Sequence, residues 1–388
     1  MDFSVGSRKL HPDPNFNYQL NRTALWSGGD WDELADAAKR ISNAADWERE
    51  ILGLGEKALA DNRIQNAIAY FRMAEFFMYD GNPEKLNIYH KAKELFNQLN
   101  APVFDSGEIR REQVPYRGAY LPVWVALPTQ DIKDTLLIHG GFDSYIEEFF
   151  LMARYLADSG YAVYIFEGPG QGEALRVGNL KFTCEWNMPI AAILDYYNLD
   201  NVTLIGISLG GVLAPRTAAF EKRIRRVVGF SIMPDLFDIF LSKQSRSLRN
   251  AISIMLSIKQ KRLLNAIAKQ KLSRNPMLDW QLHHAMYAFG VGNVFDLLIE
   301  LKKYQIDDVG ELVDQDFLLI GASEDHFIPV SFYKDEIDAL PNVRSLTYRL
   351  FTEQENAGTH CSAGNVKLVL DFISNWIDLV KRTDEITK

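Results

Sequence analysis

The feature that most constrains how this chain folds is a regular alternation of short apolar runs with helix-length segments. Five such runs end in glycine or a polar residue: TLLIHGG, YAVYIFEGPGQG, NVTLIGIS, RRVVGFSIM and DFLLIGASED. Short buried strands separated by helices are typical of βαβ units and of a parallel sheet. The sequence therefore predicts an α/β fold, with its functional groups at the carboxyl ends of the strands.

The segments around this alternation predict additional helices. Residues 30–98 carry apolar side chains at the spacing of amphipathic helices, so we expect a helical domain over residues 1–100. Residues 101–388 then form the α/β domain, whose first strands, EIRREQV and YLPVWVALP, pair around a turn at residues 116–118. The alternation breaks at about residues 235–300, where a long helical stretch predicts an inserted lid.

The middle of the predicted lid is strongly basic. Between Ser242 and Asn275 the chain has nine lysines and arginines and no acidic residue. Such a run is most often a solvated helix face. The alternative is an electrostatic guide for an anionic substrate or an acidic carrier partner.

Composition excludes several classes of function. The net charge of −9 argues against non-specific nucleic-acid binding by the whole chain. The two cysteines, Cys184 and Cys361, exclude a disulfide scaffold and a four-cysteine zinc site. No apolar run approaches the roughly 18 residues that cross a bilayer, and the start lacks the apolar core of a signal peptide. We therefore expect a cytoplasmic protein with no membrane partner.

A glycine-rich turn, GPGQG at residues 168–172, superficially suggests a nucleotide-binding loop. It contains a proline and lacks the following Lys-Ser/Thr pair that phosphate binding requires. We interpret it as a βα turn, and we expect neither a cofactor nor a metal.

The motif that most directly suggests chemistry is G-x-S-x-G, formed by Gly206, Ser208 and Gly210. It lies between an apolar strand and a helix-capable run. An abrupt strand-to-helix turn strains the backbone of its central residue, and the two glycines supply the room that this turn needs. The serine hydroxyl is then presented at a helix N-terminus, where unpaired N–H groups favour developing negative charge. Ser208 is therefore the predicted nucleophile; the alternative is a glycine-rich turn with an incidental serine.

A serine hydroxyl needs a base, and position along the chain ranks the seven histidines for that task. When the nucleophile lies on such a turn, the acid follows a late strand and the histidine precedes the last helix. His360 fits because it lies between SLTYRLFTE and VKLVLDFISNWIDLV. The predicted acid is Asp325, after DFLLIGASED; Glu324 stays the alternative, and His326 is interpreted as a loop residue.

The run LLIHGGFDSYIEEF predicts an oxyanion hole. The corner at residues 139–141 is typical of loops that direct an N–H group toward a developing negative charge. The predicted donors are the N–H of Gly141 or Phe142, together with that of Leu209. Asp143, in the same loop, is a candidate substrate-binding residue. The alternative is a Gly-Gly turn without this role.

Taken together, the motifs GGFDSYIEE, FEGPGQGE, GISLGGVLAPRTAAFEKRI and AGTHC resemble one branch of the α/β-hydrolases over about residues 108–380. This branch includes 2,6-dihydroxypseudooxynicotine hydrolase and fungal polyketide-shortening hydrolases. The resemblance implies a mostly parallel sheet flanked by helices, an N-terminal helical domain, a helical lid and a homodimer. One departure is Glu167, where the branch has an aspartate before GPGQG.

The resemblance also implies hydrolysis through a Ser-His-Asp triad, carried over onto Ser208, His360 and Asp325. Attack on a small-molecule carbonyl compound would release an alcohol, an amine or an enolate carbon. We therefore expect cleavage of an ester, an amide or a carbon–carbon bond next to a carbonyl. Asp235 and Asp238, at the start of the lid, are candidates for substrate contact and proton delivery. The alternatives are an acyltransferase with the same triad and a non-catalytic interaction or regulatory protein.

Overall fold

The computed structural model describes residues 3–386, and the chain divides into two units. The first unit contains Ser106–Ile239 and the chain from Tyr304 onward, together with the short segment that precedes Ser7. The second unit contains Ser7–Asp105 and Phe240–Lys303.

The first unit is built on an eight-stranded sheet with the strand order β1-β2-β4-β3-β5-β6-β7-β8. Strand β2 pairs antiparallel with β1 and β4, and all other neighbours are parallel. The predicted α/β fold and its opening hairpin are thereby confirmed. The strands are β1 (Arg110–Tyr116), β2 (Ala119–Ala126), β3 (Asp134–His139), β4 (Tyr161–Phe166), β5 (Val202–Ile207), β6 (Ile224–Phe230), β7 (Asp316–Ala322) and β8 (Ser345–Phe351).

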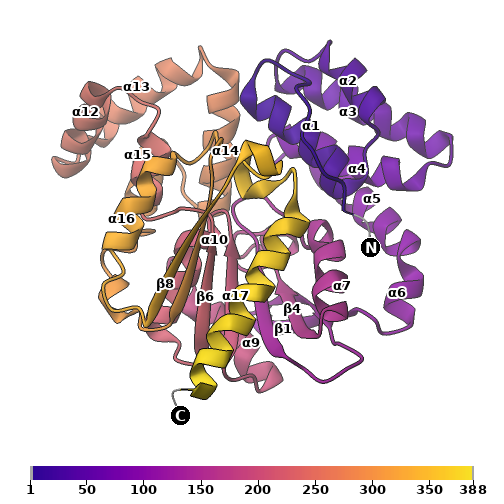
Figure 1. Ribbon diagram of the computed structural model, residues 1–388. Helices are drawn as coiled ribbons and strands as arrows, with labels where there is room; N and C mark the ends of the chain where they lie inside the picture. The colour runs from indigo at the N-terminus through magenta and orange to yellow at the C-terminus, as the bar shows by residue number, and fades with distance from the viewer. Residues whose placement is uncertain (1–2, 387–388) are drawn as a thin grey trace. The chain divides into compact units, whose positions relative to one another are not determined.

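Helices pack against this sheet. They are α7 (Phe150–Asp158), α8 (Gly172–Arg176), α9 (Asn187–Tyr197), α10 (Gly210–Phe220), α16 (Tyr333–Asp338) and α17 (Val366–Ile386), while α11 (Leu236–Leu241) begins in this unit. Helices α7 and α17 lie side by side in front of the sheet in Figure 1, joined by a hydrogen bond from Tyr155 to Asp371. Helix α10 packs on β5 and β6. Strands β4, β5 and β7 are buried along their whole length, which explains why they are mostly apolar.

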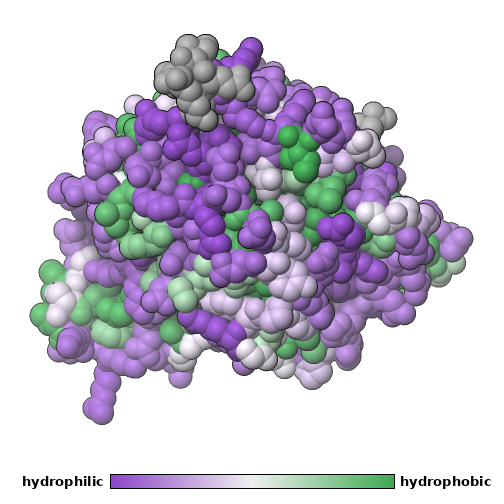
Figure 2. All heavy atoms as spheres, turned by 90° about the horizontal axis from the view of Figure 1, so that it is seen from below, coloured by the Kyte–Doolittle hydropathy of each residue, from purple (hydrophilic) through white to green (hydrophobic). Residues whose placement is uncertain are grey.

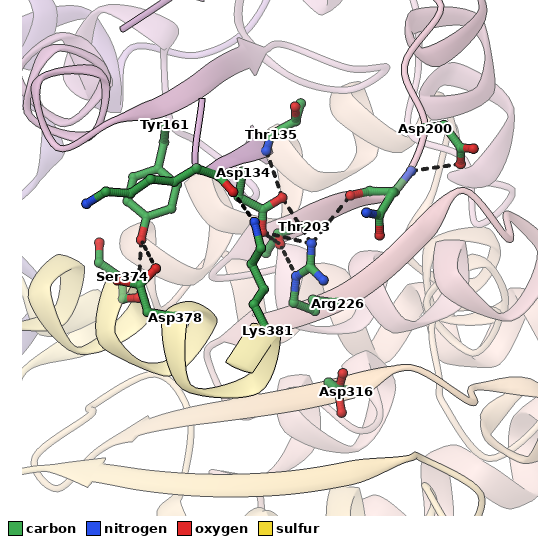
Figure 3. A network of polar contacts seen from close by, with 12 residues as sticks. Asp134, Thr135, Tyr161, Asp200, Thr203, Arg226, Asp316, Ser374, Asp378 and Lys381 are labelled. Atoms are coloured by element: carbon green, nitrogen blue, oxygen red, sulfur yellow. Dashed lines mark hydrogen bonds and ion pairs between the residues drawn. The ribbon is translucent and has the colours of Figure 1, made fainter. Parts of the chain in front are cut away.

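A buried polar network ties together the amino ends of three strands (Figure 3). The Arg226 guanidinium lies 2.8 Å from Asp134 Oδ2, and its Nε donates to Thr203 Oγ1 at 2.9 Å. The Thr203 hydroxyl in turn donates to Asp134 at 3.2 Å. Each of these three side chains bonds to another, so the buried charge pair is stabilised. The network lies at the amino ends of the strands, away from their carboxyl ends.

The second unit is helical. Its helices are α1 (Pro14–Ser27), α2 (Trp31–Ala38), α3 (Ala44–Ala60), α4 (Ile64–Ala74), α5 (Pro83–Leu99), α6 (Ala101–Asp105), α12 (Arg246–Ser257), α13 (Lys261–Leu272), α14 (Pro276–Phe289) and α15 (Val294–Leu301). Helix α1 begins well before residue 30, the position from which the apolar spacing predicted helices. Asp13 caps it by accepting from the N–H groups of Asn15 and Phe16, and Pro14 occupies its first turn.

The core of the second unit joins segments that lie about two hundred residues apart in the sequence. Trp280 of α14 packs edge-on against Phe77, with ring centroids 4.7 Å apart, and donates to the carbonyl of Met78 at 3.3 Å. His284, one turn later, contacts Asp80 at 2.9 Å. The inserted helix α14 therefore belongs to the same hydrophobic core as the N-terminal helices.

Figure 2 shows one face of the molecule, covered mostly by hydrophilic side chains with smaller hydrophobic patches between them. Within residues 3–386, none of the helices combines the length and the apolar character needed to span a membrane.

Candidate active site

Ser208 occupies the turn between β5 and α10, at the carboxyl end of the sheet. Its φ of 60° lies in the left-handed region, so the turn holds the serine in a strained conformation. A β-carbon on Gly206 would lie 2.1 Å from the carbonyl oxygen of Gly210. The small residues of the motif are therefore a steric requirement of this turn.

His360 lies in a short 3₁₀ turn between β8 and α17, and its Nε2 is 2.9 Å from Ser208 Oγ. The two following residues, Cys361 and Ser362, both have positive φ values, so the chain turns sharply as it leaves the histidine. The imidazole is buried, and the ring of Phe327 packs edge-on against it at 5.0 Å.

Asp325 follows β7 and contacts the other side of the imidazole, with 2.6 Å between its Oδ2 and His360 Nδ1. Its Oδ1 accepts from the N–H groups of Phe327 and Ile328, at 2.8 and 3.0 Å. The carboxylate can only accept, so Nδ1 carries the proton and Nε2 is left to accept from the Ser208 hydroxyl. The structure thus brings Asp325, rather than Glu324, to His360.

Each of these two groups changes the pKa of the other. Burial opposes ionisation of Asp325, but the charge and hydrogen bond of His360 and the two backbone donors outweigh it and lower the pKa of the carboxyl group. Burial likewise favours a neutral His360, but the nearby Asp325 charge and the contact with Cys361 raise the pKa of the imidazole well above its ordinary value. Asp325 therefore stabilises the protonated form of His360 relative to the neutral ring, which favours transfer of the Ser208 proton to Nε2.

The loop after β3 passes directly beside the serine. A β-carbon on Gly141 would lie 2.7 Å from Ser208 Cβ and 2.8 Å from the backbone nitrogen of Leu209. Within residues 3–386 the Leu209 N–H donates to no other group. The Gly141 N–H, by contrast, donates to Ser144 Oγ at 3.2 Å. The sequence predicted the N–H of Gly141 or of Phe142 as an oxyanion-hole donor. Because the Gly141 N–H already bonds to Ser144, the Phe142 N–H stays the predicted donor.

Three acidic residues predicted to contact substrate lie in different settings. Asp143 is half-buried in the loop between β3 and the following 3₁₀ turn. Asp235 accepts from the N–H of Asp238 at 2.9 Å, and burial raises the pKa of its carboxyl group. Among the described residues, neither Asp235 nor Asp238 has a hydrogen bond to Ser208 or His360.

Two buried polar residues beside this site were given no role in the sequence analysis. Gln171 donates from Nε2 to the carbonyls of Gly140 and Gly141, at 2.7 and 2.9 Å. Glu167, which stands where the resembled branch has an aspartate, accepts from the N–H groups of Ile146 and Glu173, at 2.9 and 2.7 Å. The only available signal was their place in FEGPGQG, a turn in which polar residues immediately follow a wholly apolar strand.

The turn GPGQG connects β4 to α8, so its interpretation as a βα turn is confirmed. Its glycines are required by packing, since a β-carbon on Gly168 would lie 2.4 Å from the Trp186 ring and one on Gly170 would lie 2.2 Å from the Phe182 ring. Within the described part of the chain, no group of three or more His, Cys, Asp or Glu side chains could hold a metal ion.

A family model described as "alpha/beta hydrolase fold" matches residues 136–357 of this chain. The chain is 26% identical to the hydrolyase poxO of Penicillium oxalicum over 375 residues, which cover 90% of this chain and 87% of that protein. It is 27% identical to the 20-hydroxy-prefusarin hydrolase FUS2 of Gibberella moniliformis over 418 residues, which cover 95% of this chain and 97% of that protein.

Two solved structures share the fold. The crystal structure of the 2,6-dihydroxy-pseudo-oxynicotine hydrolase superposes with a TM-score of 0.63 at 19% identity, covering 92% of this chain and 94% of that one. AbyA5 superposes with a TM-score of 0.66 at 18% identity, covering 93% of this chain and 94% of that one. The predicted resemblance to 2,6-dihydroxypseudooxynicotine hydrolase and to fungal hydrolases is confirmed.

Proposed function

Because this chain belongs to the α/β-hydrolase fold family and is a hydrolase, we propose that it acts through a serine nucleophile, with Ser208 attacking, His360 as general base and Asp325 orienting the imidazole. The observation that supports this most strongly is the continuous line of hydrogen bonds, 2.9 Å from Ser208 to His360 and 2.6 Å from His360 to Asp325. These residues come from three separate loops at the carboxyl edge of the sheet, which favours a functional origin for their alignment.

In the proposed first step, Ser208 Oγ forms a bond to a substrate carbonyl carbon while its proton passes to His360 Nε2. Asp325 stabilises the resulting imidazolium, in agreement with the raised pKa of His360. The negative charge on the carbonyl oxygen would be stabilised by the Leu209 N–H and, from the neighbouring loop, the Phe142 N–H. Collapse then breaks the bond to the leaving group, which takes the proton from His360.

A water molecule completes the proposed cycle: its oxygen forms a bond to the acyl carbon while His360 Nε2 accepts a proton. The bond between the acyl carbon and Ser208 Oγ then breaks, and the proton returns from His360 to Ser208 Oγ. The same steps release an alcohol from an ester, an amine from an amide, or an enolate from a compound with a second carbonyl. We propose a small-molecule carbonyl compound as the substrate class. The name of FUS2, a hydrolase, supports hydrolysis over acyl transfer.

The test is covalent labelling and turnover of wild type and Ser208→Ala. Wild type should react with a fluorophosphonate probe and should hydrolyse at least one member of a panel of esters, amides and β-diketones. Ser208→Ala should not label, and its turnover should fall by as much as about 10⁶-fold, because loss of the nucleophile removes the function of the whole triad. An Asp314→Asn variant, altered at an exposed position before β7, controls for general effects of substitution. Turnover by Ser208→Ala near the wild-type rate would contradict the proposal.

A further inference from the structure

The side chain of Gln171, in the turn GPGQG, forms hydrogen bonds with the loop beside Ser208. Gln171 is only 2% exposed. Its Nε2 donates to two successive carbonyls of the loop after β3, those of Gly140 and Gly141, and its Oε1 accepts from the N–H of Gly168 at 2.9 Å. Both amide hydrogens are used, so an apolar residue in place of Gln171 would remove a donor from each carbonyl, and the Gly141 carbonyl would lose the donor that Gln171 supplies.

The two carbonyls fix the directions of the N–H groups that follow them. A trans peptide is planar, with its C=O and N–H pointing in opposite directions, and no cis peptide bond occurs within residues 3–386. The Gly141 carbonyl points at Gln171, so the N–H of Phe142 points away from it. The Gly140 carbonyl is held twice, by Gln171 and by His139 Nδ1 at 2.9 Å, so the Gly141 N–H also points away and meets Ser144 Oγ.

The far end of the same loop is held from the same turn. Glu167 Oε1 accepts from the N–H of Ile146, while its Oε2 accepts from that of Glu173 at the start of α8. His139, which flanks the near end, is fully buried, and burial lowers the pKa of its imidazole to about 4, so it is a neutral donor at Nδ1. The loop is therefore fixed at both ends by buried side chains rather than by its own two glycines.

From this geometry we infer that Gln171 is a positioning residue for the oxyanion hole: it holds the 141–142 peptide so that the Phe142 N–H faces the reacting carbonyl oxygen beside the Leu209 N–H. This inference rests on the proposed function. Two consecutive glycines make a peptide flip inexpensive, and a flip would present a carbonyl where a donor is needed. Gln171 acts against that flip without touching the substrate.

The chain offers a closely matched control. Gln315 is also 2% exposed, donates from Nε2 to the carbonyl of Ala218 at 2.9 Å, and accepts from the N–H of Asp314. It lies before β7, at the opposite end of the sheet from Ser208. Gln171→Met and Gln315→Met both preserve side-chain volume; the first removes three buried hydrogen bonds and the second two, so both should lower thermal stability.

The experiment measures the rate of fluorophosphonate labelling and the inhibition constant of a trifluoromethyl ketone, which forms a tetrahedral adduct on the serine. For Gln171→Met we expect labelling to slow by about 10- to 100-fold, a part of the 10²- to 10³-fold that complete loss of one oxyanion donor costs. The ketone should bind more weakly by a similar factor, while KM for any ester that the wild type hydrolyses stays unchanged. Gln315→Met should label at the wild-type rate.

The outcomes separate this inference from the proposed function. If the wild type does not label, the proposed function fails. If the wild type labels and Gln171→Met labels equally fast, or if Gln315→Met is slowed as much as Gln171→Met, the positioning role is wrong while the nucleophile stands. Should Gln171→Met fail to fold, Gln171→Asn, which keeps the amide but shortens its reach, is compared with Gln315→Asn by the same criteria.

Discussion

The imidazole of His360 owes its proton affinity chiefly to one neighbour. Asp325 raises the pKa of His360 against the opposing effect of burial, and the base must be neutral to accept the Ser208 proton. Activity should therefore rise with pH through the pKa of His360. A substitution of Asp325 should therefore shift the pH dependence of activity, and a simple loss of rate would not.

We predict that Asp325→Asn moves the acidic limb of kcat/KM to lower pH. Removing the carboxylate removes the charge that favours the imidazolium, so the pKa of His360 falls. The rate should also fall by about 10⁴-fold, because an asparagine no longer holds the productive tautomer. The measurement is a pH profile of ester hydrolysis from pH 5 to pH 9.

The neighbouring Glu324→Gln is the control for that profile, since Asp325, and not Glu324, contacts the imidazole of His360 within residues 3–386. It should keep both the wild-type rate and the wild-type acidic limb. An Asp325→Asn profile whose acidic limb coincides with that of the wild type would show that Asp325 does not control the protonation of His360.

The sequence could be used to rank residues that lie in recognisable motifs. It could not identify residues whose hydrogen-bond partners are distant along the chain. The hydrogen bonds of Ser208, His360 and Asp325 join the residues that the G-x-S-x-G turn and the order along the chain single out. Gln171 could not be found in this way, because its partners are backbone carbonyls some thirty residues earlier and leave no side-chain pattern. The choice between Gly141 and Phe142 also required coordinates, since it depends on where Ser144 Oγ lies.

Strands β3, β5 and β6 are joined at their amino ends by the buried network of Arg226, Asp134 and Thr203. The side chains of Arg226 and Asp134 are 1% and 4% exposed, so removing one charge leaves the other without its partner in a low-dielectric interior. The three strands lie next to one another in the central part of the sheet, and β5 leads directly to Ser208. The network therefore stabilises the elements on which the site depends.

We predict that Asp134→Ala lowers the free energy of unfolding by about 3 to 5 kcal/mol, measured by urea denaturation. Replacing both partners, Asp134→Leu with Arg226→Met, should recover most of this loss because no buried charge is left alone. The exposed pair of Lys222 and Asp314 provides the control, since Asp314→Ala should change stability little. A small effect of Asp134→Ala alone would show that the network contributes little to the sheet.

The elements that sequence patterns predicted best were the buried strands, whose continuous apolar runs end at glycine or a polar residue. Helix α1 was not singled out, although Asp13 and Pro14 form a recognisable start and Phe16, Leu20 and Ala24 follow at helical spacing. Its buried polar residues Asn21 and Arg22 weaken the apolar pattern, so the signal lay in the cap rather than in the periodicity.

The two units of the molecule are each built from segments that are separated in the sequence. Residues 240–303 interrupt the sheet-containing unit in sequence but share a unit with residues 7–105. Sequence reasoning could find both helical stretches, but it could not pair them, because the contact of Trp280 with Phe77 joins positions with no periodic relation.

We predict that Trp280→Ala destabilises both stretches of the helical unit together. Loss of a large buried aromatic side chain costs about 3 to 5 kcal/mol. Hydrogen exchange followed by mass spectrometry should show faster exchange in α1 and α4 as well as in α14, while strands β3 to β7 keep their protection. Trp376→Ala, at an equally buried tryptophan of α17, should instead affect the sheet-containing unit. Faster exchange confined to α14 would contradict a shared core.

The division of the helical unit into two stretches has a consequence for how the protein is made. Helix α14 begins 171 residues after Asp105, so at 5 to 20 residues per second a ribosome needs roughly 10 to 30 s to supply it. During that interval the nascent N-terminal helices lack Trp280, and part of their aromatic core stays open. Chaperone capture of the emerging polypeptide is therefore expected to matter most while the central strands are being translated.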